Sequence, residues 1–124
     1  MTLRGRAATA DDIAIFYPGM TASFRAWVCE LDGKVEGIIG VALLRPVACM
    51  FSAFREALRP YLRHPAVLRL IKKAQGAVKA VRAPVWAAAE PGETESPKIL
   101  TRLGFEHVGT MFGDEIYEFR GGGE

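Results

Sequence analysis

Ser96-Pro97-Lys98-Ile99-Leu100-Thr101-Arg102-Leu103-Gly104-Phe105 is the stretch of sequence that decides the fold. Ser96, or Thr94 just before it, can accept a hydrogen bond from the free amides of a first helical turn, and Pro97 has the φ angle of an early helical position. Gly104 can adopt the left-handed conformation that ends a helix, and Phe105 then begins an apolar run. The stretch therefore predicts a short capped helix that stops on glycine and continues directly into a strand.

The rest of the chain divides into further predicted strands and helices. Residues 4–8 read as a first strand, and Thr9 with Asp12 three residues later has the pattern of a capping box at the start of a helix. Two apolar runs, 26–31 and 35–44, are joined by Asp32-Gly33, which supplies the positive φ angles of a tight hairpin. The later predicted elements are strands at 47–51, 85–89, 105–108 and 115–119, with a long basic helical region and the helix ending at Gly104 between them.

Length and composition indicate one globular domain. With 124 residues, 50% of them hydrophobic, the chain can bury one core, which we place at residues 1–120, followed by a disordered glycine-rich tail at 121–124. No apolar run approaches the roughly 20 residues of a membrane span, and the first residues lack the pattern of a signal peptide, so we expect a cytoplasmic protein without a membrane partner. Cys29 and Cys49 lack metal-ligand spacing, so we predict buried thiols and no metal site.

Positive charge is concentrated in the middle of the chain. Eight of the sixteen basic residues lie between Arg55 and Arg82, against Glu56 as the only acid in that segment. From Pro65 onward apolar residues recur at three- and four-residue steps, which predicts an amphipathic helix with its basic residues turned away from the core. Three interpretations remain open: a solvated helix face, anion binding near the helix start, or nucleic-acid binding. Interleaved aromatic residues are missing, so nucleic acid is the least favoured.

The Leu103-Gly104-Phe105 sequence and the order of the elements resemble the Gcn5-related N-acetyltransferase (GNAT) family, in which "LGF" follows the last helix. The resemblance implies an α+β fold with a central, mainly antiparallel sheet flanked by helices and splayed between strands 47–51 and 85–89. It also implies acetyl-CoA as the cofactor and transfer of its acetyl group to an amine of a small molecule or protein.

The sequence departs from the family pattern at three places. The family's Q/R-x-x-G-x-G/A loop, which holds the CoA pyrophosphate, is absent, because no glycine lies between Phe51 and Gly76. Many family members have a tyrosine that protonates the leaving thiolate, and Leu100 stands at that position here. The family's cofactor-binding asparagine corresponds to a position near Glu93. The connection 17–24 is too short for the second helix that usually forms part of the acceptor wall. The chain therefore resembles a degenerate member of the family.

Candidate site residues follow from what the family's chemistry requires. The backbone of the strand at 47–51 would hold the pantetheine arm, and a helix starting at Pro65 would offer its first amides to the pyrophosphate, with basic side chains in place of the missing glycines. The candidate cofactor-binding residues are Met50, Phe51, Arg63, Ala66 and Val67. Glu90, at the carboxyl end of strand 85–89, is the candidate catalytic base, with a solvated loop carboxylate as the alternative.

Two functions remain open. The first is an acetyl-CoA-dependent N-acetyltransferase acting on an unidentified amine. The second is a non-catalytic interaction or structural protein with the GNAT fold, of the kind encoded by phages and prophages, in which Phe51, Phe54 and Leu58 fill the cleft. Segment 52–64 separates them: we expect a short helix there, which either folds into the cleft or presents an apolar face to a partner subunit or protein.

Overall fold

The computed structural model describes residues 1–44, 46–89 and 95–120. They form a seven-stranded sheet in the order β1-β2-β3-β4-β5-β7-β6. The strands are β1 (Leu3–Ala7), β2 (Ser23–Leu31), β3 (Lys34–Leu43), β4 (Ala48–Phe54), β5 (Val85–Ala89), β6 (Phe105–Met111) and β7 (Asp114–Phe119). The helices are α1 (Ala10–Phe16), α2 (Pro65–Ala80) and α3 (Glu95–Arg102), and a 3-10 turn, η1, spans Arg59–Tyr61.

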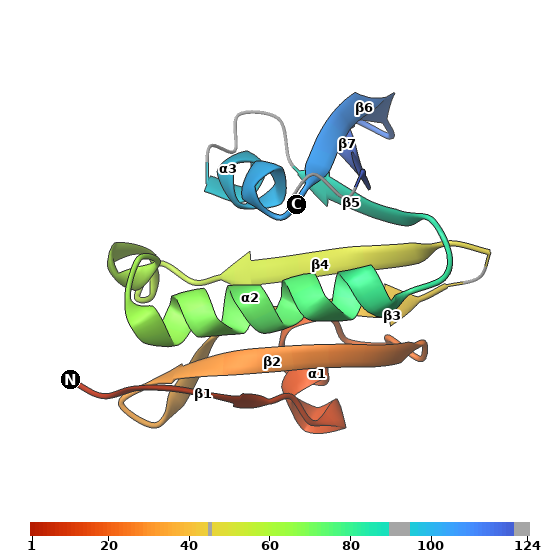
Figure 1. Cartoon of the computed structure of the whole chain (residues 1–124). Coiled ribbons are helices and arrows are strands. Elements are labelled where there is room, and N and C mark those ends of the chain that lie inside the picture. Colours follow the sequence, from red (N-terminus) through yellow and green to blue (C-terminus); the bar gives the residue numbers. More distant parts are fainter. Residues whose placement is uncertain (45, 90–94, 121–124) are drawn as a thin grey trace.

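The sheet is mixed and mainly antiparallel: β4 and β5 are parallel neighbours, and every other pair of neighbouring strands is antiparallel. These two strands pair only at Ala48 with Val85 and at Cys49 with Trp86, whereas β4 pairs with β3 along its full length. Beyond these two pairs β4 and β5 separate, and the gap opens toward α3 (Figure 1). The predicted α+β fold with a sheet splayed between these strands is therefore confirmed.

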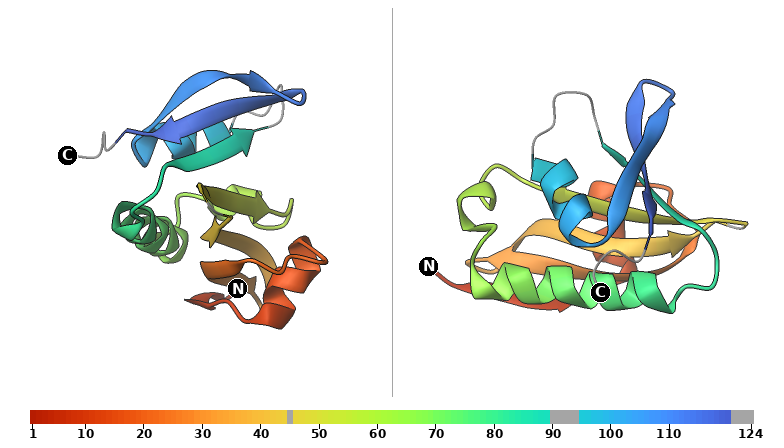
Figure 2. Two further views of the ribbon diagram at one scale, coloured as in Figure 1. Left: turned by 90° about the vertical axis from the view of Figure 1, so that its right-hand side faces the viewer. Right: turned by 45° about the horizontal axis from the view of Figure 1, so that its top comes forward.

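Helices cover both faces of the sheet (Figure 2). Helix α2 packs across β1, β2 and β3, and α3 packs on β5 and β6 of the same face, where a single buried cluster includes Val67 and Leu70 of α2 with Leu100 of α3. Helix α1 lies on the opposite face, where Ile13 packs with Val28 and Ile38. Different helices therefore cover the two faces: α2 and α3 cover one, and α1 covers the other. The gap between β4 and β5 is in the sheet itself, between these two helical layers.

Local signals in the sequence place most element ends correctly. Thr9 is the N-cap of α1 and forms the predicted capping box with Asp12, and the turn between β2 and β3 has positive φ at Asp32 (52°) and Gly33 (84°). Gly104 (φ 98°) ends α3 as expected. Ser96 lies inside α3, so its prediction as N-cap is wrong, and Thr94 lies outside the described residues.

The segment after Phe51 differs from the prediction. β4 continues to Phe54, so only the single turn η1 replaces the expected short helix. Phe54 and Leu58 pack over Gly37 of β3, where a Cβ atom would lie 2.5 Å from Leu58 and 2.9 Å from Phe54. Phe51 faces the other side of the sheet, against Tyr17. The three side chains therefore do not meet in a cleft between β4 and β5, and Gly37 is the feature that accommodates this packing.

Like Thr94, the predicted tail at 121–124 and the candidate base Glu90 lie outside the described residues. Within the described residues, no helix is both long and apolar enough to cross a membrane.

Candidate functional site

Among the described residues, β4 and β5 form no strand pairs beyond Cys49 and Trp86, so the edge of β4 is open past this point. The amide of Ala48 donates to Pro84 next to β5, whereas the amide of Arg55 donates to Glu36 of β3. Because successive residues of a strand direct their backbone groups to opposite edges, Met50, Ser52 and Phe54 face the β5 side, and Ser52 and Phe54 lie beyond the residues that form the last β4–β5 pair. Past the last β4–β5 pair, the opened edge of β4 can therefore bind an extended ligand through its backbone.

A cationic cavity lies between α2 and α3, next to this opening. Its volume is about 110 Å³, and three of its lining residues are basic: Arg63 before α2, and Lys98 and Arg102 on α3. The remaining lining residues are apolar: Leu62, Leu68, Ile71 and Ile99. Arg63 follows β4 in the chain and α3 follows β5, so the cavity lies beyond the carboxyl ends of the two parallel strands, a common position for ligands in such sheets.

The start of α2 is capped by a side chain of its own. His64 Nδ1 accepts a hydrogen bond from the amide of Ala66 at 3.1 Å, and the His64 carbonyl accepts from the amides of Val67 and Leu68 at 3.0 Å each. Ala66 and Val67 are also buried, at 7% and 1% exposure. An anion can reach the Ala66 amide only when the His64 ring turns away.

The face of the opening that carries α1 is lined by aromatic side chains. Tyr17 packs edge-on against Phe51 with ring centroids 5.1 Å apart. Trp86 of β5 is paired with Cys49 and donates its indole N–H to Glu118 at 2.9 Å. Burial, with a smaller contribution from Cys49, raises the pKa of Tyr17 to about 12, so its hydroxyl is protonated at neutral pH. This face combines an apolar surface with one phenolic proton donor.

The structure brings some of the predicted site residues together. Met50 directs its backbone toward β5 at the point where the opening begins, and Arg63 lines the cationic cavity. The alternation along β4 directs both backbone groups of Phe51 toward β3, where it pairs with Gly40. Leu100, at the family's tyrosine position, is buried at 4% exposure, and the connection from α1 to β2 contains no helix.

Lys98 and Arg102 were missed by the sequence analysis. They are four residues apart in α3, so they lie on one face of the helix, while Leu100 and Leu103 are buried in the core. This spacing was a usable signal. What the sequence did not show is that α3 lies beside the start of α2, so that the pair joins Arg63 at one cavity.

Comparison with known proteins places the fold. No protein-family model and no curated protein matches the chain by sequence. Solved structures do match: the PaiA N-acetyltransferase of Thermoplasma acidophilum in complex with coenzyme A has a TM-score of 0.66 at 12% identity, covering 97% of this chain and 99% of the other. A GNAT-family acetyltransferase of Staphylococcus aureus has a TM-score of 0.66 at 9% identity, covering 95% and 98%.

The ribosomal-protein-S18-alanine N-acetyltransferase of Escherichia coli also matches, with a TM-score of 0.62 at 14% identity, covering 95% of this chain and 93% of the other. The chain therefore has the acyl-CoA N-acyltransferase fold of the GNAT acetyltransferases, as its sequence pattern predicts. Nothing in these comparisons supports the alternative of a non-catalytic protein of phage origin.

Proposed function

We propose that the protein is an acyl-CoA-dependent N-acyltransferase that binds acetyl-CoA between β4 and β5. The observation that carries the proposal is the parting of these strands after two residue pairs, beside a cavity lined by three cations. One neighbour in fold was crystallised with coenzyme A, which supports the choice of cofactor.

The residues around the opening suit the parts of this cofactor. Arg63, Lys98 and Arg102 provide positive charge for the phosphates, and the apolar lining of the same cavity suits the adenosine. The opened edge of β4, at Ser52 and Phe54, provides amides and carbonyls for the pantetheine arm. In this chain, arginine and lysine side chains take the place of the glycine-rich loop as the main phosphate contacts.

Bound acetyl-CoA would supply the thioester carbonyl; the amine nitrogen would bond to its carbon while the carbon–sulfur bond breaks, and CoA would leave as the thiol after its thiolate takes a proton from solvent. Backbone amides along β4 would polarise the carbonyl, and Glu90, directly after the last residue of β5 in the sequence, would accept the proton of the amine. The acceptor approaches from the face carrying Tyr17, Phe51 and Trp86, because the cofactor phosphates occupy the face of α2 and α3. We therefore propose an acceptor amine with an apolar or aromatic body, from a small molecule or a protein.

Calorimetric titration with CoA tests the binding site. Arg63→Gln and Arg102→Gln should each weaken binding about ten-fold or more, the effect of losing a charge-assisted hydrogen bond. Arg69→Gln removes the same charge from an exposed position of α2 outside this cavity and should leave the affinity nearly unchanged. If millimolar CoA gives no heat of binding, the proposed enzyme is refuted. If CoA binds but the protein releases no CoA from acetyl-CoA in the presence of varied amines, the protein only binds CoA.

The role of the α2 amides has a separate test in His64→Gly. Glycine is an acceptable N-cap, so the helix should persist, and the Ala66 amide becomes available. If Ala66 and Val67 contact the pyrophosphate, CoA should bind about five-fold tighter, because one competing hydrogen bond has been removed. An unchanged affinity would restrict the phosphate contacts to the basic side chains.

A further inference from the structure

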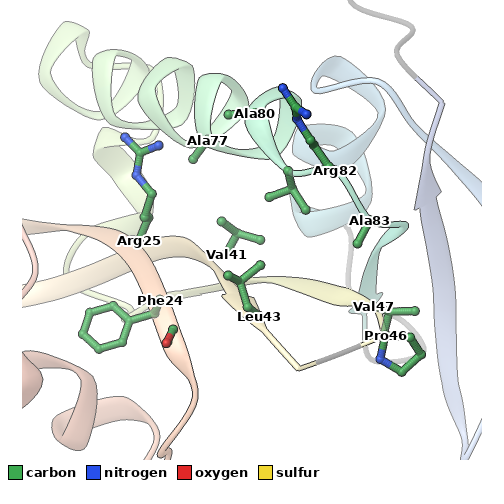
Figure 3. Close-up of a pocket in the computed structure, with 12 residues that line it drawn as sticks. Phe24, Arg25, Val41, Leu43, Pro46, Val47, Ala77, Ala80, Arg82 and Ala83 are labelled. Atoms are coloured by element: carbon green, nitrogen blue, oxygen red, sulfur yellow. The ribbon is translucent and has the colours of Figure 1, made fainter.

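A second cavity, larger than the cationic one, lies away from the opening between β4 and β5. It has a volume of about 500 Å³ and lies under the carboxyl end of α2 (Figure 3). Val41 and Leu43 of β3 form its floor, and Ala77 and Ala80 of α2 lie above them. The volume lies within the range of small-molecule sites and far exceeds the voids that ordinary packing leaves.

Small side chains create this space. The α2 residues that line the cavity are alanines, Ala77 and Ala80, whereas the larger Val67 and Leu70 are buried in the core near the start of the helix. Leu43 is 42% exposed although it is a large apolar residue at the edge of the cavity. An apolar surface that is open to solvent in this way favours an apolar ligand, since burying it removes that surface from water.

Two arginines flank the cavity from different elements. Arg25 of β2 lies on one side of the α2 end and Arg82, two residues after the helix, on the other (Figure 3). The Cζ atom of Arg25 lies 5.9 Å from the centroid of the Trp27 ring. The described lining residues include no carboxylate. Arg82 lies near the carboxyl end of α2, where the helix dipole favours a positive charge. The dipole does not explain the second cation, Arg25 on β2.

We propose that this cavity is a binding site for an amphipathic monocarboxylate, whose chain lies over Val41 and Leu43 and whose carboxylate is attracted by the positive charges of Arg25 and Arg82 at the rim. The chemical class follows from the lining: two cations, no anion and an otherwise mainly apolar wall. This site is separate from the proposed acetyl-CoA site, and it does not depend on that function.

Titration of isotope-labelled protein with octanoate, followed by amide NMR, tests the proposal, with octanol as the uncharged matched ligand. Shifts should map to Val41, Val47 and Ala77. Octanol should bind more weakly, and Arg82→Gln and Arg25→Gln should each weaken octanoate binding about ten-fold. Arg69→Gln, with the same change in charge elsewhere on α2, should have no effect. Equal affinity for octanol and octanoate, or equal effects of all three arginine variants, would overturn the proposal.

Ala80→Trp fills the cavity from an exposed helix position and should abolish octanoate binding while leaving the amide spectrum folded. Unchanged binding by this variant, or shifts confined to Arg63 and Arg102 around the other cavity, would also overturn the proposal. Sedimentation of the unliganded protein checks the remaining occupant. A dimer that Ala80→Trp converts to a monomer would show that a second copy, not a carboxylate, covers this surface.

Discussion

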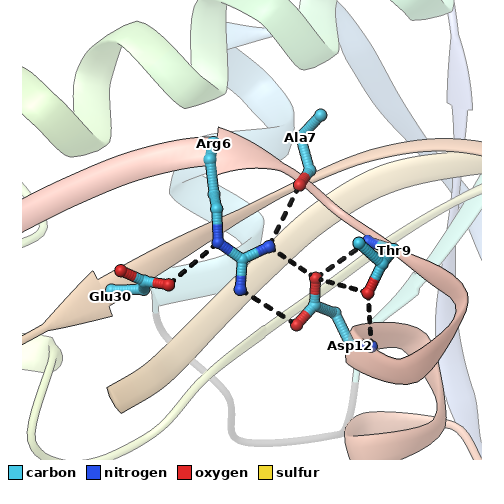
Figure 4. A network of polar contacts seen from close by, with 5 residues as sticks. All are labelled: Arg6, Ala7, Thr9, Asp12 and Glu30. Carbon is cyan, nitrogen blue, oxygen red and sulfur yellow. Dashed lines mark hydrogen bonds and ion pairs between the residues drawn. The ribbon is translucent and has the colours of Figure 1, made fainter. Parts of the chain in front are cut away.

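At the scale of single residues, Asp12 joins three elements at the amino end of the fold. Its carboxylate accepts hydrogen bonds from Arg6 of β1 at 2.6 and 3.1 Å and from the Thr9 amide at 2.8 Å, and Arg6 also pairs with Glu30 of β2 (Figure 4). Asp12 is only 6% exposed. The hydrogen bonds from Arg6 are the main reason that the pKa of Asp12 falls from 3.8 to about 2.

This shift predicts the acid sensitivity of the fold. Because the folded pKa lies below the unfolded one, the contribution is fully present above about pH 4 and disappears as the pH falls toward 2, with a loss of about 2 kcal/mol. Asp12→Asn should be less stable than the native protein at pH 7 and should lose less stability between these pH values, as measured by urea unfolding. Asp11→Asn, at the exposed neighbouring position, is the control. Parallel pH profiles for the native protein and Asp12→Asn would contradict the assignment.

At the scale of elements, the packing between the end of β4 and the η1 turn depends on Gly37. Leu58 is fully buried, so Leu58→Ala should destabilise the protein by about 2 to 5 kcal/mol. Gly37→Ala should cost about 1 to 3 kcal/mol, because the new Cβ would lie 2.5 Å from Leu58 Cδ2. The double variant should cost less than the sum, because the methyl group enters the space that Leu58 leaves. Strict additivity in chemical unfolding would show that the two residues do not share this space.

The sequence could predict elements better than it could predict their surroundings. The Thr9–Asp12 capping box, the Asp32-Gly33 turn and the Gly104 stop depend on neighbouring residues, and the structure confirms each of them, whereas Ser96 lies inside α3 and is not its N-cap. Segment 52–64 was misread because Phe54, Leu58 and Leu62 recur at helical steps, yet pairing of β4 with β3 extends the strand to Phe54. A tertiary contact with Gly37, seventeen residues before Phe54, is invisible to periodicity.

At the scale of the whole molecule, the sheet consists of two parts joined at β4 and β5. β1 to β4 carry α1 and α2, and β5 to β7 carry α3, with only two residue pairs between the parts. The splay could be predicted from the order of elements through the family resemblance. The cationic cavity could not, because Arg63 and the Lys98–Arg102 pair are far apart in sequence and meet only when the two parts pack together.

The opening between the two parts predicts a pattern of amide hydrogen exchange along β4. Ser52 and Phe54 direct their amides into the opening, whereas Phe51 and Ala53 direct theirs toward β3, so Ser52 and Phe54 should exchange faster in the free protein. Saturating acetyl-CoA should slow both, because the pantetheine arm provides acceptors along this edge. Equal protection of all four amides in the free protein would show that the edge already has a partner. If the Ser52 and Phe54 amides still exchange fast in the acetyl-CoA complex, the pantetheine arm does not lie along β4. This conclusion would hold even if Arg63 and Arg102 were shown to bind the cofactor.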